Sequence, residues 1–100
     1  MLVKLCNKGD ISVGELIAFK IKGNEVLAVN LGSKIVCLEG RCTHAGASLA
    51  EGNLEGEVLT CPWHYSQFNV ITGEVIRGPA GKPLKTYRIE EKDGIVFIEG

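Results

Sequence analysis

Short apolar runs separated by glycine-bearing turns make up much of this chain. Residues 15–40, "ELIAFKIKGNEVLAVNLGSKIVCLEG", hold three such runs, with turns at Gly23-Asn24 and Gly32-Ser33. Alternation of side chains between two faces is typical of β-strands, and glycine is frequent in the turns that join them. This stretch therefore predicts three consecutive antiparallel strands.

Two later stretches show the same pattern. Residues 66–78, "SQFNVITGEVIRG", predict a hairpin that turns at Thr72-Gly73. Residues 84–100, "LKTYRIEEKDGIVFIEG", predict another that turns at Asp93-Gly94. No stretch shows a useful helical period, so we expect an all-β fold of antiparallel sheets.

Length and charge narrow the class of protein. The 100 residues suit a single domain, residues 1–100, and the 45% hydrophobic content is ordinary for a globular chain. A formal net charge of −1 provides no basic surface for nucleic acid or an anionic membrane. The beginning, "MLVKLCNKGD", does not resemble a signal peptide, and no run reaches the roughly 20 apolar residues of a membrane span. We expect a soluble, cytoplasmic monomer.

The four cysteines divide into two pairs. Cys42 and Cys61 each lie close to a histidine, whereas Cys37 falls in a predicted strand and Cys6 lies near the N-terminus. A disulfide scaffold requires an oxidising compartment, which nothing in the sequence indicates. Cys6 and Cys37 are therefore interpreted as small buried apolar residues, with a disulfide between them as the alternative.

The candidate chemistry lies in the pattern Cys42-x-His44 followed by Cys61-x2-His64. A structural zinc ion accepts two cysteines and two histidines, but only one residue separates Cys42 from His44, which strains their binding to a single ion. A Cys61 nucleophile with His64 as base leaves two residues unused and lacks an orienting group. Four unrelated residues are a third alternative. The paired spacing favours a [2Fe–2S] cluster, in which each segment serves both irons.

The stretch "CTHAGASLAEGNLEGEVLTCPWHYSQFNVITGEV" resembles the Rieske [2Fe–2S] domain family, and the likeness continues through "GPAGKPLKTYRI" and "DGIVFIEG". The resemblance implies stacked antiparallel β-sheets with a small cluster-binding loop subdomain at about residues 40–80. It also implies that Cys42 and Cys61 bind one iron, while His44 and His64 bind the other near the surface.

Departures from the high-potential members of the family bear on the reduction potential. Their extra cysteines, which form a disulfide, correspond to Ala47 and Trp63, and their hydrogen-bonding tyrosine corresponds to Phe68. A lost donor to sulfur disfavours the reduced cluster, so we expect a potential in the lower half of the family range of about −150 to +300 mV. Ser66 matches the family's second donor, although a surface-facing Ser66 is an equal alternative.

Other residues have supporting roles in this interpretation. Gly46 is expected to permit a tight turn. Trp63 is expected to pack over the base of the cluster, with docking of a partner as the alternative. The resemblance implies that Pro79 belongs to a loop covering the cluster. Arg41, together with His44 and His64, is a candidate for partner docking, although a solvated strand-end charge is the favoured explanation of Arg41.

The predicted function is that of a soluble one-electron carrier, a Rieske-type ferredoxin. It would pass electrons from a reductase to a terminal acceptor such as an oxygenase. The chain is too short to include a mononuclear iron or flavin domain, so it is not expected to be an enzyme by itself. The alternatives are a Rieske subunit of a multisubunit oxidoreductase and, in a different class, a structural zinc-binding module.

Overall fold

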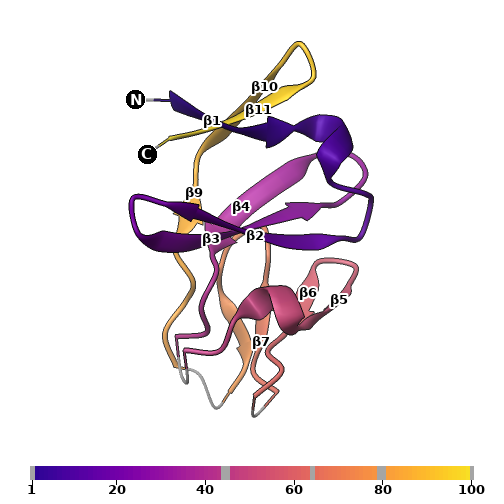
Figure 1. Ribbon diagram of the computed structural model, residues 1–100. Helices are drawn as coiled ribbons and strands as arrows, with labels where there is room; N and C mark the ends of the chain where they lie inside the picture. Colours follow the sequence, from indigo (N-terminus) through magenta and orange to yellow (C-terminus); the bar gives the residue numbers. More distant parts are fainter. Residues whose placement is uncertain (1, 44–45, 64, 79–80, 100) are drawn as a thin grey trace.

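Three antiparallel sheets are stacked on one another in the computed structural model, which describes residues 2–43, 46–63, 65–78 and 81–99 (Figure 1). This confirms the predicted all-β fold. Within the described residues the helical segments are two single 3-10 turns, η1 and η2. The elements are β1 (Leu2–Asn7), η1 (Lys8–Asp10), β2 (Leu16–Ile21), β3 (Asn24–Asn30), β4 (Ile35–Glu39), η2 (Leu49–Glu51), β5 (Asn53–Glu55), β6 (Val58–Thr60), β7 (Gln67–Asn69), β8 (Val75–Arg77), β9 (Thr86–Tyr87), β10 (Ile89–Lys92) and β11 (Ile95–Glu99).

The middle sheet, with strand order β2-β3-β4-β9, is buried on both faces. Side chains alternate along β3, so Leu27 and Val29 enter one hydrophobic core while Val26 and Ala28 enter another. The near-continuous apolar run of β3 follows from this double burial. We call the core that contains Leu27 the cluster-side core, because it extends toward the Cys/His loops, and the other the terminal core.

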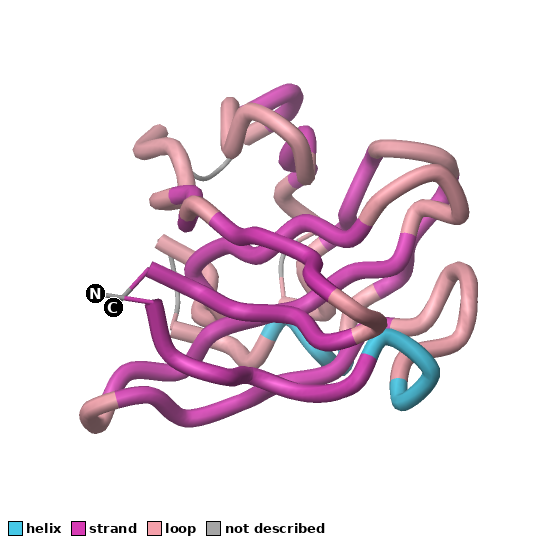
Figure 2. Tube along the Cα trace, turned by 90° about the horizontal axis from the view of Figure 1, so that it is seen from above, coloured by secondary structure: helices cyan, strands magenta, loops and turns pink. Residues whose placement is uncertain are grey.

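The sheet on the terminal core has the order β1-β11-β10 and contains both chain ends. Antiparallel pairing of Leu2 with Glu99 brings the two ends side by side (Figure 2). Strand β1 was not predicted from the sequence. Its burial is confined mainly to Cys6, so its sequence lacks a long alternating apolar pattern.

The third sheet, with order β5-β6-β7-β8, covers the cluster-side core. Each of its four strands is three residues long, and Leu59 and Phe68 are cross-strand partners with no exposed surface. The predicted hairpin of residues 66–78 is present as β7 and β8. This sheet supports the loops that carry the Cys/His pattern.

The last predicted hairpin is divided between two sheets. Tyr87 in β9 pairs with Cys37 of the middle sheet, whereas Ile89 in β10 pairs with Ile98 of the terminal sheet. The chain changes sheets at Arg88, so the arm expected to be one strand is two. Tyr87 and Ile89 both pack against the terminal core, and this shared burial accounts for the unbroken alternation.

The first tight turn lies one residue earlier than predicted. Lys22 and Gly23 both have positive φ, 52° and 83°, and Ile21 pairs with Asn24. Two successive positive φ values define the type I′ turn that suits the twist of a hairpin. Asn24 therefore begins β3 instead of ending the turn.

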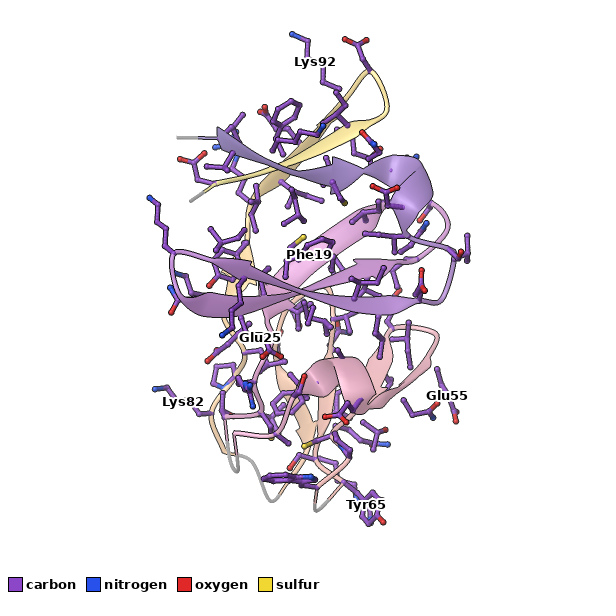
Figure 3. The ribbon with its side chains drawn as sticks, in the orientation of Figure 1. Phe19, Glu25, Glu55, Tyr65, Lys82 and Lys92 are labelled. Atoms are coloured by element: carbon purple, nitrogen blue, oxygen red, sulfur yellow. The ribbon has the colours of Figure 1, made fainter. Side chains whose placement is uncertain are left out.

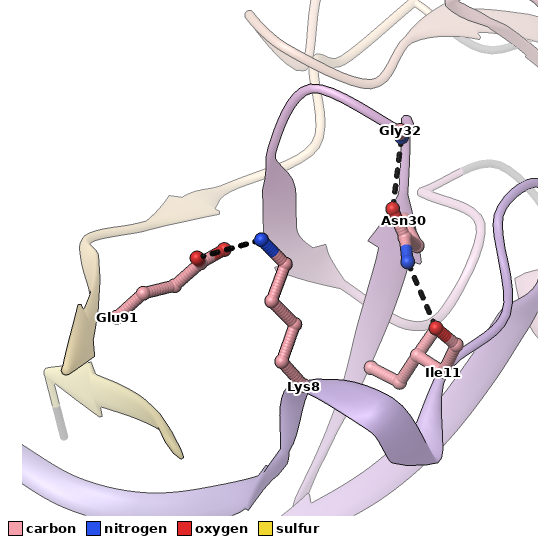
Figure 4. Close-up of polar contacts among 5 residues, drawn as sticks. All are labelled: Lys8, Ile11, Asn30, Gly32 and Glu91. Carbon is pink, nitrogen blue, oxygen red and sulfur yellow. Dashed lines mark hydrogen bonds and ion pairs between the residues drawn. The ribbon is translucent and has the colours of Figure 1, made fainter. Parts of the chain in front are cut away.

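Polar contacts hold the segment after β1 onto the sheets (Figure 4). The buried Asn30 side chain donates to the carbonyl of Ile11 at 2.8 Å and accepts from the Gly32 N–H at 2.8 Å. Lys8 forms an ion pair with Glu91 at 3.3 Å. Asn30 is thereby satisfied on both sides, as a buried amide must be to avoid a net destabilisation.

Cys37 lies 2% exposed in the terminal core, and burial, with a smaller effect of Cys6, raises the pKa of its thiol from 9.0 to about 12. Between these values the unfolded chain loses the proton and the folded chain keeps it. We therefore expect the free energy of unfolding to fall as pH rises from about 9 toward 12, by about 1.4 kcal/mol per pH unit from this group. Urea unfolding of wild type and Cys37→Ala at several pH values measures this contribution of the Cys37 thiol. If the free energies of unfolding of the two proteins change with pH in parallel, the raised pKa of Cys37 is contradicted.

No helix in the described part of the chain has the length and apolar character to span a membrane.

Candidate metal centre

Three loops converge at the end of the molecule opposite the termini (Figure 1). The first, residues 40–48, follows β4; the second, residues 61–66, joins β6 to β7; the third, residues 78–85, follows β8. The strands that carry these loops border the cluster-side core, so the loop bases are fixed by buried packing. Loops supported in this way are suited to hold a ligand.

Backbone hydrogen bonds shape the first loop around Cys42. The Cys42 N–H donates to the Ala47 carbonyl at 2.9 Å, and the Gly46 N–H donates to the Cys42 carbonyl at 2.9 Å. Gly46 has a φ of 73°, a left-handed conformation that glycine adopts readily. The tight turn expected at Gly46 is present.

The second loop repeats this plan. The Cys61 N–H donates to the Ser66 carbonyl at 2.8 Å, again five residues along the chain. Four residues after Cys61, Tyr65 has a φ of 60°, matching the position of Gly46 after Cys42. Tyrosine is uncommon in this region, and the sequence contained no signal for it beyond that equal spacing.

The thiols of Cys42 and Cys61 meet where the two loops join the core. Cys61 is fully buried and Cys42 is 3% exposed. Burial raises the pKa of the Cys61 thiol, the Trp63 backbone N–H opposes this by donating to the sulfur, and the adjacent Cys42 raises it further. A dry site with two sulfurs disfavours a bare thiolate, and a bound cation supplies the missing positive charge.

Two adjacent buried thiols from separate loops match the donor set expected for one iron of the cluster. Among the described residues, no group of three or more metal-ligating side chains occurs. His44, His64 and Pro79 lie outside the described residues. The structure thus brings together the two cysteines of the predicted ligand set.

Ser66, Phe68 and Ala47 all lie at the buried side of the loops. Ser66 and Phe68 have no exposed surface, and Ala47 is 2% exposed. A surface-facing Ser66 is therefore wrong. Phe68 belongs to the same core cluster as Cys42 and Cys61.

Phe68→Tyr is expected to raise the reduction potential by about 40 mV, because one hydrogen bond to a cluster sulfur favours the reduced form by about 1 kcal/mol. Protein-film voltammetry on both proteins measures the shift. Phe68→Leu is the control that changes the same buried position without adding a donor. An unchanged or lowered potential in Phe68→Tyr would contradict the donor argument.

Two large aromatic side chains of the second loop are exposed. Trp63 is 56% exposed and Tyr65 is 71% exposed. Figure 3 places Tyr65 at the outer end of the molecule, beyond the loop-bearing sheet. This exposure favours partner docking over packing for Trp63.

Arg41 lies beside Cys42 and is held by two contacts. Its Nη2 forms an ion pair with Glu25 Oε1 at 2.9 Å, and its Nη1 donates to the Gly46 carbonyl at 3.0 Å. Ser48 Oγ donates to the other Glu25 oxygen at 2.7 Å. The sequence analysis missed Glu25 and Ser48, because nothing in the chain order links residue 25 to the loop.

Thr43 connects the first loop to the third. Its hydroxyl donates to the Lys82 carbonyl at 2.6 Å, across 39 positions of sequence. The described end of the third loop is thereby fastened beside the loop that carries Cys42. This contact was also missed, since a threonine between two predicted ligands has no distinctive sequence signal.

The family model for the Rieske [2Fe-2S] domain matches residues 1–88. The chain belongs to the Rieske [2Fe–2S] domain family. The biphenyl 2,3-dioxygenase ferredoxin component of Rhodococcus jostii (strain RHA1) is 36% identical over 99% of this chain and 94% of its own. Ferredoxin CarAc of Metapseudomonas resinovorans is 37% identical over 98% of this chain and 92% of its own.

A solved structure shows the same fold. The chain superposes with a TM-score of 0.93 and 34% identity on a structure described as a complex of reduced oxygenase and oxidized ferredoxin in carbazole 1,9a-dioxygenase, covering 99% of this chain and 93% of that chain. These similarities confirm the Rieske fold, the [2Fe–2S] cluster as cofactor and the function of an electron carrier that is not itself catalytic.

Proposed function

We propose that this Rieske protein carries single electrons from a reductase to the oxygenase of an aromatic-ring dioxygenase system. The observation that carries the proposal is the pair of adjacent buried thiols, Cys42 and Cys61, at the loop-bearing end of a Rieske fold. Relatives that span nearly the same length are ferredoxin components of biphenyl and naphthalene dioxygenase systems. The chain covers 94% of the length of the biphenyl dioxygenase ferredoxin component, which supports the role of a carrier.

The ligand set that we propose is Cys42 and Cys61 on one iron with His44 and His64 on the other. A bound cluster supplies one-electron chemistry, since mixed ligation leaves the oxidised centre less negative than four thiolates would. The chain holds the two sulfurs in a dry core, and the Trp63 N–H is directed at the Cys61 sulfur. Ser66 and the core around Phe68 complete the surroundings that set the potential, for which we propose the lower half of the family range.

The docking face that we propose surrounds the outer end of the loops, with Trp63 and Tyr65 added to the predicted His44 and His64. Exposed aromatic rings suit a short-lived interface, because they bury large area on contact and lose little conformational freedom. Arg41 contributes less than predicted, since its guanidinium is engaged by Glu25 and Gly46.

A cytoplasmic location and a single domain with a cluster-binding part at about residues 40–80 also belong to the proposal. Free thiols at Cys6 and Cys37 support a reducing compartment. The separate β5–β8 sheet with its loops supports the division.

The test is electron delivery. The dithionite-reduced protein, first characterised by EPR for mixed Cys/His ligation, is mixed in a stopped-flow instrument with an oxidised biphenyl or carbazole dioxygenase oxygenase. Reduction bleaches the visible absorbance of the carrier's cluster. We expect this absorbance to return as the carrier passes its electron to the oxygenase, at a rate that rises with oxygenase concentration. A protein that stays reduced, or that purifies in a tight complex with another chain, would favour the alternative of a Rieske subunit. A colourless protein with one zinc ion would refute both.

A further inference from the structure

Glu25 is a core-facing carboxylate at the start of β3, distant in sequence from every residue of the Cys/His pattern. Its side chain is only 11% exposed, although a glutamate at a strand end is usually solvated. Figure 3 shows it between the middle sheet and the loop-bearing end. A carboxylate removed from water in this way needs strong partners to offset its desolvation.

Both polar contacts of the Glu25 side chain, and one of its main-chain carbonyl, go to the first ligand loop and its base. One carboxylate oxygen binds the Arg41 guanidinium at 2.9 Å and the other accepts from Ser48 Oγ at 2.7 Å. Its main-chain carbonyl accepts from the Gly40 N–H at 2.9 Å. Glu25 therefore contacts residues of this loop on both sides of Cys42.

Arg41 links Glu25 to the far side of the loop. While one nitrogen binds Glu25, another donates to the Gly46 carbonyl, next to the turn that returns the chain toward the core. The loop base is also closed by the bridge between Arg41 and Ser48. Charge-assisted hydrogen bonds of this kind are stronger than neutral ones and fix direction as well as distance.

Gly40 adds evidence that the contact is close-packed. A Cβ at Gly40 would lie 2.8 Å from Glu25 Cγ and 3.0 Å from its carbonyl oxygen. Gly40, which immediately precedes Arg41 and Cys42, thus packs so closely against Glu25 that a side chain there would clash.

We propose that Glu25 is a positioning residue for the metal centre, which acts through Arg41 and Ser48 to hold the first ligand loop in its cluster-binding conformation. The inference rests on the proposed ligand Cys42. The side-chain contacts of Glu25 are with Arg41 and Ser48, so its effect on the metal centre is indirect. Its loss should free the loop and expose the cluster edge to water and chelator.

The first test compares Glu25→Gln with Glu57→Gln, which removes an equal charge from an exposed carboxylate in the turn between β5 and β6. Loss of visible cluster absorbance is followed in excess chelator without denaturant. We expect Glu25→Gln to lose its cluster about five- to thirty-fold faster than wild type, and Glu57→Gln to match wild type. Equal rates for Glu25→Gln and wild type would overturn the proposal.

The second test does not depend on the cluster. Trypsin is applied to the apoproteins, and cleavage after Arg41 is quantified by mass spectrometry against cleavage after Lys92 in the distant β10–β11 hairpin. We expect Glu25→Gln to accelerate cleavage after Arg41 alone. Acceleration at both sites would show general loss of folding and refute a positioning role.

Ser48→Ala provides a milder variant, because it removes one of the two carboxylate contacts. Its effect should have the same direction as that of Glu25→Gln and a smaller size. In a double-mutant cycle, Arg41→Ala in the Glu25→Gln background should add little, since both act through one contact. Additive effects would contradict the proposed route through Arg41. The proposed ligands are tested separately, by measuring whether the wild-type protein binds a cluster at all.

Discussion

Replacement of Cys61 by serine is expected to yield a folded protein that lacks the colour and the EPR signal of a [2Fe–2S] cluster. Cys61 is fully buried and its sulfur adjoins that of Cys42, as the proposed binding of both cysteines to one iron requires. A serine hydroxyl is a harder and more weakly ionised donor than a thiolate, and iron–sulfur clusters select soft thiolate ligands. Iron analysis and visible absorbance of the purified protein measure the loss.

Cys37→Ser is the matched control. Cys37 is buried almost as completely, at 2% exposure, but lies in the terminal core on the other face of the middle sheet. It undergoes the same chemical change and should retain its cluster while losing about 1–2 kcal/mol of stability from the buried hydroxyl. Full iron content in Cys61→Ser, or an equal loss of iron in Cys37→Ser, would contradict the assignment of the cysteines.

This contrast between the two cysteine pairs could be predicted from the sequence. The short spacing to His44 and His64 marked Cys42 and Cys61, and alternation within an apolar run marked Cys37 as a core residue. Both inferences depend on residues close together in the chain. The resemblance to the Rieske family, and not proximity in the chain, implied that Ala47 and Trp63 stand where high-potential relatives have the cysteines of a loop disulfide.

The contacts that support the loops could not be predicted in this way. Glu25 meets Arg41 from another strand, and Thr43 meets the Lys82 carbonyl across 39 positions. A charge or a hydroxyl in the sequence has many partners available, and only the folded backbone selects one. The left-handed conformation of Tyr65 is likewise imposed by the loop, because tyrosine by itself does not favour it.

The strand pattern shows a similar limit. Hairpins with an alternating apolar face and a glycine turn were recognisable, whereas β5 and β6 have three residues each and too few positions to show a period. The division at Arg88 between two sheets was hidden because Tyr87 and Ile89 pack on the same core. Hydrophobic alternation reports which core a residue enters and not which strand is its neighbour.

Gly73→Ala is expected to destabilise the protein by about 3 kcal/mol and to lower its melting temperature by about 12–24 °C. Gly73 has a φ of 79°, where a side chain costs about 1–2 kcal/mol. An added Cβ would also lie 2.1 Å from the Leu84 carbonyl oxygen, so the backbone there must move. Overpacking of this kind adds about 1–3 kcal/mol.

Gly94→Ala separates these two costs. Gly94 has a similar φ of 76°, but nothing lies within 4 Å of the Cβ position, so this variant should lose only about 1 kcal/mol. The difference between the two variants in free energy of unfolding, measured in urea, then gives the cost of the steric contact between the added Cβ at Gly73 and Leu84. Equal destabilisation of both would show that φ alone matters.

The position of Gly73 connects this packing to the metal centre. Its carbonyl accepts from the Leu84 N–H at 2.8 Å, and Leu84 belongs to the cluster-side core that also contains Cys42 and Cys61. The carbonyl of Lys82, two residues earlier, accepts a hydrogen bond from the Thr43 hydroxyl. Displacement of Leu84 should therefore loosen the third loop from the first, so Gly73→Ala should lose its cluster faster in chelator than Gly94→Ala does. If both variants lose the cluster at the wild-type rate, the third loop does not depend on Gly73 for its position.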